Sequence, residues 1–149
     1  MLSIHALAAG VHEVLSTLLL KTGRGSGFLR DFDRIRPERL AEYKSHMTRT
    51  QNFLKHANQD PDHVLDYYKE ATPFLIFDAV TMYSTLAGAL KVRAFAIFLS
   101  WFILENPSLL KEGTVLDYVK DFARNGPFDK DHFRKMLKNP DSYPIPGLQ

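Results

Sequence analysis

Three polar side chains at helical spacing form the most distinctive candidate site in the chain. Arg49, Asn52 and His56 recur at steps of three and four residues, so a helix places them on one face. Lys55 adds a second cation, and Asp60 follows in the next turn, where it can orient the imidazole. Together these groups can bind a phosphate, and a histidine exchanges its proton near neutral pH. We expect Asn52, Lys55 and Asp60 to bind, and His56 and Arg49 to supply the chemistry.

This constellation suits the cleavage of RNA without a metal ion, which needs a base for the 2′-hydroxyl proton and a cation for the phosphorane. His56 is then the base or a positioning group, and Arg49 stabilises the charge. The competing hypothesis is a non-enzymatic helical interaction module. In that case His56 and Asn52 hydrogen-bond the turn and cap the helix C-terminus, where a cation is favoured, and the segment from Asn52 to Asp60 is structural.

The same residues resemble a known motif. Six residues separate Arg49 from His56, which is similar to the loose R-x(4–6)-H signature of HEPN domains, and Asn52-x-x-x-His56 resembles the end of their common R-N-x-x-x-H form. In that form arginine directly precedes asparagine, a position that Gln51 holds here, so the motif's arginine is either Arg49 or absent. HEPN domains are small, all-α and usually dimeric, and many are RNases of toxin–antitoxin and abortive-infection systems. The resemblance implies an all-α homodimer that binds or cleaves RNA.

A second resemblance covers most of the chain. The segments SIHALAAGVHEVL, IRPE, NFLKHANQDPD and FLIFDAV resemble those of an uncharacterised family of bacterial proteins of similar size. Those proteins tend to carry an additional helix before the first of these segments. The resemblance implies a bacterial source and a natural N-terminus upstream of Met1, and it implies no activity.

Charge is concentrated in one part of the chain. The 149 residues carry 19 Lys and Arg against 17 Asp and Glu, a net charge of only +2. Residues 21–55 alone hold nine basic and four acidic side chains, a local excess of five positive charges. Such an excess favours an anionic partner, RNA among them. The competing interpretation is a solvated helix face with local ion pairs such as Arg39 with Glu42, three residues apart.

Two further histidines are seven residues apart, which places His5 and His12 on one helical face. Helical bundles can build metal sites from such residues, so a histidine-liganded metal protein is a third hypothesis. The chain has no cysteine and no H-E-x-x-H pattern. We therefore expect no metal and no cofactor, with His5 and His12 partly buried and hydrogen-bonded by neighbouring polar atoms. His46 and His132 are expected at solvated helix positions.

Helical spacing of apolar residues dominates the sequence and predicts an all-α protein. We expect one domain over residues 1–149: a compact bundle of five or six helices in a HEPN-like or related up-and-down arrangement, with antiparallel neighbours. Capping residues, Gly and Pro set the ends of the helices. Ser3, Thr72, Thr114 and Asp129 are among the expected N-caps, and residues 139–149 are expected to be an extended tail. The helices are expected at about 4–22, 37–57, 73–87, 92–105, 115–125 and 130–138.

The absence of cysteine excludes disulfides and thiolate metal sites. No basic residue precedes Lys21, so the N-terminus does not read as a secretory signal. The longest apolar run, Ala94 to Leu104, is about half the roughly 20 residues that span a bilayer. We expect a cytoplasmic protein without membrane contact. If the natural chain starts upstream, a helix that packs on the first one is missing and its apolar surface is left open to a second subunit. Truncation and a homodimer are therefore both open, and a homodimer is the expected oligomeric state.

Overall fold

The chain is an all-α protein in the part that the computed structural model describes, residues 2–24, 36–56, 69–109 and 129–142. These residues contain five α-helices and one short 3₁₀ helix, and no strand. The prediction of an all-α fold class is confirmed. The helices are α1 (Leu2–Thr22), α2 (Pro37–His56), α3 (Ala71–Ala87), α4 (Arg93–Glu105) and α6 (Lys130–Lys138), with η2 at Pro140–Ser142.

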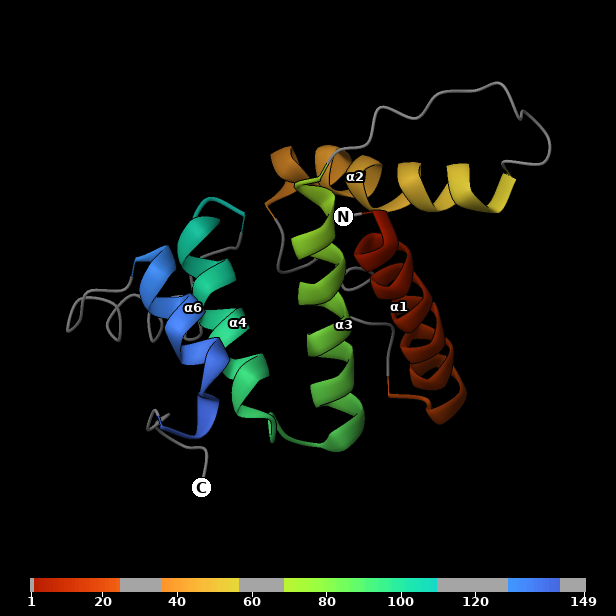
Figure 1. The fold of residues 1–149 in the computed structure, drawn as a ribbon. Helices are drawn as coiled ribbons and strands as arrows, with labels where there is room; N and C mark the ends of the chain where they lie inside the picture. Colours follow the sequence, from red (N-terminus) through yellow and green to blue (C-terminus); the bar gives the residue numbers. More distant parts are fainter. Residues whose placement is uncertain (1, 25–35, 57–68, 110–128, 143–149) are drawn as a thin grey trace.

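The central pair of helices, α1 and α3, packs in parallel. His5 of α1 contacts Thr72 of α3, and His12 contacts Asp78, so residues later in α1 meet residues later in α3. Figure 1 shows α2 crossing the ends at which both helices begin, α4 running back beside α3, and α6 against α4. The consecutive helices α3 and α4 are antiparallel, as predicted for neighbours joined by short loops, whereas α1 and α3, which are not consecutive, are parallel. A parallel pair requires a return path across the fold, and α2 lies on that path.

Glycine and aspartate end or begin three helices as predicted. Gly23 and Gly88 follow α1 and α3 with φ of 64° and 72°, a left-handed conformation that glycine adopts without steric cost. Lys21 stands in the last turn of α1, where a cation is favoured. Asp129 caps α6 by accepting a hydrogen bond from the backbone N–H of His132 at 2.7 Å.

Two of the predicted caps are wrong. Thr72 lies inside α3, whose N-cap is Glu70, and its hydroxyl contacts His5. Ser3 lies inside α1, which begins one residue earlier at Leu2. The prediction of an extended tail is wrong for Pro140–Ser142, which form the 3₁₀ helix η2. The predicted helix at 115–125, its expected cap Thr114 and the tail beyond Ser142 lie outside the described residues.

Aromatic rings from α3 and α4 form the centre of the core. Phe102 is fully buried, stacks on Phe77 at a centroid distance of 4.4 Å and meets the edge of Phe74 at 5.0 Å. Ala8 and Ala9 bring α1 close to this cluster because their side chains are short. The apolar run Ala94 to Leu104 is part of α4 and supplies core residues, as its interpretation as a buried helix predicted.

Candidate functional site

Two residues of the predicted polar face lie on the second half of α2. Arg49 and Asn52 are both exposed, and Phe53 beside them is half-buried. The helix reaches His56, one residue short of its expected end, so Arg49 and Asn52 share a face as predicted. The side chains of Lys55 and His56 lie outside the described part of the chain, as does Asp60. The structure thus brings together two of the five predicted site residues and leaves the other three untested.

The described basic side chains of residues 21–55 differ in the hydrogen bonds and ion pairs that they make. Arg39 pairs with Glu42 at 2.9 Å, as expected for a solvated face with local ion pairs. Arg24 donates a hydrogen bond to the carbonyl of Leu86 at 2.6 Å. Arg49 makes no hydrogen bond or ion pair with the described residues. Lys21 is exposed at the end of α1 far from α2 (Figure 1), so the described positive charge does not gather into one patch.

A second set of exposed bases lies on α6, where charge counting over long segments did not find it. Lys130, Lys135 and Lys138 are exposed and make no ion pair with the described residues, whereas Arg134 pairs with Asp131 at 2.9 Å. Residues 56–149 as a whole carry more acidic than basic side chains, so a charge count over that segment did not reveal the basic side chains of α6. Counting charges over single predicted helices would have found it. Lys135 and Lys138 also stand in the last turn, where a cation stabilises the helix itself.

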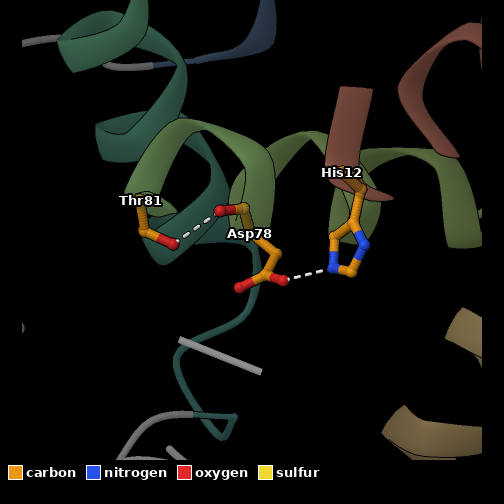
Figure 2. A network of polar contacts seen from close by, with 3 residues as sticks. All are labelled: His12, Asp78 and Thr81. Atoms are coloured by element: carbon orange, nitrogen blue, oxygen red, sulfur yellow. Dashed lines mark hydrogen bonds and ion pairs between the residues drawn. The ribbon is translucent and has the colours of Figure 1, made fainter. Parts of the chain in front are cut away.

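Two histidines of α1 face polar side chains of α3, which the sequence predicted without naming the partners. Nδ1 of His5 lies 2.9 Å from the hydroxyl of Thr72, and Nε2 of His12 lies 2.5 Å from Oδ2 of Asp78. Figure 2 shows the second pair, together with Thr81, whose hydroxyl donates to the backbone carbonyl of Asp78. The side chain of Asp78 is 1% exposed and that of His12 is 18% exposed. These contacts hold α1 against α3.

Burial changes the acid–base behaviour of His5. Its side chain is fully buried between α1 and α3. Loss of hydration disfavours the charged imidazolium, which lowers the pKa of His5 below its usual 6.5. The neutral ring can accept a hydrogen bond from the hydroxyl of Thr72. His5 therefore acts as a buried structural residue.

Residues 2–24, 36–56, 69–109 and 129–142 contain no group of three His, Cys, Asp or Glu side chains placed to hold a metal ion. His12 and Asp78 together supply two ligands, one fewer than the three protein ligands of a catalytic zinc site. The arrangement can hold two helices together.

Comparison with known proteins gives no relative from which a function could be transferred: no family model, curated protein or solved structure matches the chain. In the described residues, one helix, Ser3–Thr22 of α1, is long and apolar enough to cross a membrane by length and composition. Core helices and signal sequences pass the same test.

Proposed function

We propose that the protein is a helical module that binds an anionic partner, RNA in the first instance, through the exposed face of α2 around Arg49 and Asn52. One observation carries the proposal. The guanidinium of Arg49 and the amide of Asn52 stand exposed one helical turn apart, and neither makes a hydrogen bond or ion pair with the described residues. A cation and an amide with unused donors suit phosphate oxygens and base edges.

The state of Asn52 is compatible with this proposal, because its amide is exposed and makes no hydrogen bond with the described residues. The turn at residues 57–60, which a structural role of Asn52 would engage, lies outside the described residues. Arg39 is offset by Glu42 on the same helix, whereas Arg49 is a cation that no acidic side chain of the described residues pairs with, so it is available to a partner.

Cleavage of RNA is the finer form of this proposal and rests on the resemblance of residues 49–56 to the HEPN motif. His56 would remove the proton of a ribose 2′-hydroxyl, and the resulting oxygen would attack the adjacent phosphorus. The 5′-oxygen of the next nucleotide would leave with a proton from solvent, so the products would be a 2′,3′-cyclic phosphate and a 5′-hydroxyl. Arg49 would stabilise the charge that builds on the phosphoryl oxygens.

Fluorescence anisotropy with labelled single-stranded RNA, repeated over a range of salt concentrations, tests the proposal. Wild-type protein is expected to bind RNA with an affinity that falls as salt rises. The Arg49→Ala variant should bind more weakly and reduce the salt slope by about one. Arg39→Ala is the matched control on the same helix and should change little, because Glu42 already offsets that charge.

Variants of the basic residues of α6 test whether the partner binds that helix instead of α2. If Lys135→Ala with Lys138→Ala abolishes binding while Arg49→Ala binds as the wild type, the partner uses α6 and the proposal for α2 is wrong. RNA that stays unbound even at low salt would reject an RNA partner altogether.

A further inference from the structure

The first helix of the fold, α1, is attached to the rest of the described chain with little burial of large apolar side chains. Among its described residues Leu19 is the one large apolar side chain that is buried, and Leu15 is half-buried. An alanine gains much less from burial than a leucine or a phenylalanine does. Apolar burial therefore holds α1 less firmly than it holds α3 and α4, whose stacked rings Phe77 and Phe102 are buried. The other buried side chains of α1 are small or polar: His5, Ala8, Ala9 and Ser16.

Polar contacts with α3 hold α1 along its whole length. The histidine contacts described above lie near the beginning and in the middle of α1, with Thr72 and Asp78 as the partners. Just after the end of α1, Arg24 donates a hydrogen bond to the backbone carbonyl of Leu86 at 2.6 Å. All three partners belong to α3, beside which α1 lies in Figure 1. The attachment of α1 therefore depends on polar groups, and two of those groups are histidines.

His5 is the contact at which a proton opposes this attachment. Its side chain is fully buried, and its Nδ1 lies 2.9 Å from the hydroxyl of Thr72. A neutral ring can accept a hydrogen bond from that hydroxyl, whereas a protonated ring has donors only. Protonation would also place a charge where water does not reach it, which is costly. Because of this cost, burial lowers the pKa of His5, and a proton binds more readily once α1 has moved away from α3.

The other titratable groups around the α1–α3 interface are placed differently. His12 and Asp78 bond to each other across it. Glu13 and Lys21 of α1 itself are exposed. Histidines titrate between about pH 5 and pH 8, so in this range His5 is the fully buried histidine whose protonation opposes the docking of α1. The described charged side chains on the elements packed against α1 are exposed: Glu38, Arg39, Glu42 and Arg49 on α2, and Lys69 and Glu70 before α3.

We infer that α1 is a detachable helix, which a proton bound at His5 releases from α3 while α3, α4 and α6 stay packed together. Phe77 of α3 stacks on Phe102 of α4 at a centroid distance of 4.4 Å, and Ile97 of α4 clusters with Phe133 of α6. These contacts are apolar, so a fall in pH leaves them in place. Because α2 lies across the ends at which α1 and α3 begin (Figure 1), a release of α1 removes one of the two helices on which α2 rests.

Labelling of a single introduced cysteine tests the inference, because the chain has no cysteine of its own. Ala9→Cys places a thiol on the buried side of α1 at a position 6% exposed, and Ala96→Cys, the matched control, places one in α4 at a position 5% exposed. Both variants of the whole chain are labelled with 4,4′-dithiodipyridine from about pH 7.5 to about pH 5. Each rate is divided by that of the same variant unfolded in urea at the same pH, so that only the opening of the fold is compared.

Ala9→Cys is expected to label faster as the pH falls below 6.5, by up to about tenfold per pH unit, because the release of α1 takes up one proton at His5. Ala96→Cys should show no such acceleration. Adding His5→Gln to Ala9→Cys should remove the acceleration, because a glutamine amide can bond the hydroxyl of Thr72 and does not titrate. Circular dichroism at about pH 7.5 checks that each variant keeps its helices. Ala8→Cys, at a position 8% exposed, is a second reporter on the buried side of α1.

Three results would overturn the inference. A labelling rate of Ala9→Cys that does not depend on pH would show that acid does not release α1. An acceleration that persists unchanged after His5→Gln would assign the effect to a group other than His5. Equal acceleration of Ala9→Cys and Ala96→Cys would show that the whole fold opens together. No RNA is present in these measurements, so their outcome is independent of the proposed binding by α2.

Discussion

His12 of α1 and Asp78 of α3 join two parallel helices across 66 residues of sequence, with Nε2 of the imidazole 2.5 Å from a carboxylate that is almost completely buried. A buried carboxylate is costly unless polar groups compensate for its lost hydration. The pair therefore specifies how α1 and α3 align along their length, with the contact of His5 and Thr72 a little under two turns earlier.

The first prediction concerns the stability that this pair provides. His12→Ala should lower the free energy of unfolding by roughly 2–4 kcal/mol, because the buried carboxylate of Asp78 loses its imidazole partner. Urea unfolding measures the change. In a double-mutant cycle, adding Asp78→Ala to His12→Ala should cost less than it does in the wild type. Additive losses would show that the two side chains do not interact.

The second prediction concerns pH. Burial lowers the pKa of His5 in the folded chain, whereas the unfolded chain keeps a value near 6.5. As pH falls through 6.5 the unfolded state binds more protons than the folded state, so stability is lost below that pH and is fully present above it. Urea unfolding of His5→Gln should show a weaker loss in this range than the wild type does. An equal pH dependence in His5→Gln would contradict this assignment.

A third prediction tests catalysis separately from binding. If His56 is the base, the wild type should cleave RNA in the presence of EDTA and leave 2′,3′-cyclic phosphate ends. His56→Ala should lose that cleavage by about 100-fold or more while keeping RNA affinity and helical content. His46→Ala, on the same helix, is the control. RNA that remains intact with excess wild-type protein would reject the cleavage step and leave the binding proposal standing.

The fourth prediction concerns the core that positions α3 and α4. Phe102→Ala should destabilise the protein by about 3–5 kcal/mol, because the fully buried ring contacts both Phe77 and Phe74. Phe102→Leu should cost less because it preserves more of the volume. Thermal unfolding can compare both variants with Leu137→Ala, an exposed control on α6 that should change little. Equal losses for Phe102→Ala and Leu137→Ala would contradict the described core.

Local signals in the sequence predicted the helices well because their causes are local. Gly23, Gly88 and Asp129 act through the conformation or hydrogen bond of a single turn, and all three perform the predicted role. Thr72 shows the limit of this reasoning. A threonine followed by proline favours a helix start, but the hydroxyl of Thr72 contacts His5, which lies 67 residues away in the sequence.

Pairings between distant residues were not predictable from spacing. The sequence indicated that His5 and His12 share a helical face and meet polar partners, and the structure confirms this, yet nothing in it identified Asp78 as one partner or α1 and α3 as parallel. The exposed bases of α6 were missed because acids elsewhere in residues 56–149 outnumber them. For the candidate site, helical spacing predicted that Arg49 and Asn52 share one face of α2. The structure shows that both side chains are exposed.

The central claim, that an anionic partner contacts α2 around Arg49 and Asn52, is tested most directly by a nuclear magnetic resonance titration of labelled protein with short single-stranded RNA. Backbone amide resonances of residues 49–56 are expected to shift progressively and saturably, with smaller changes on α6. Saturable shifts centred on Lys135 and Lys138, or a spectrum unchanged by RNA at low salt, would contradict the account.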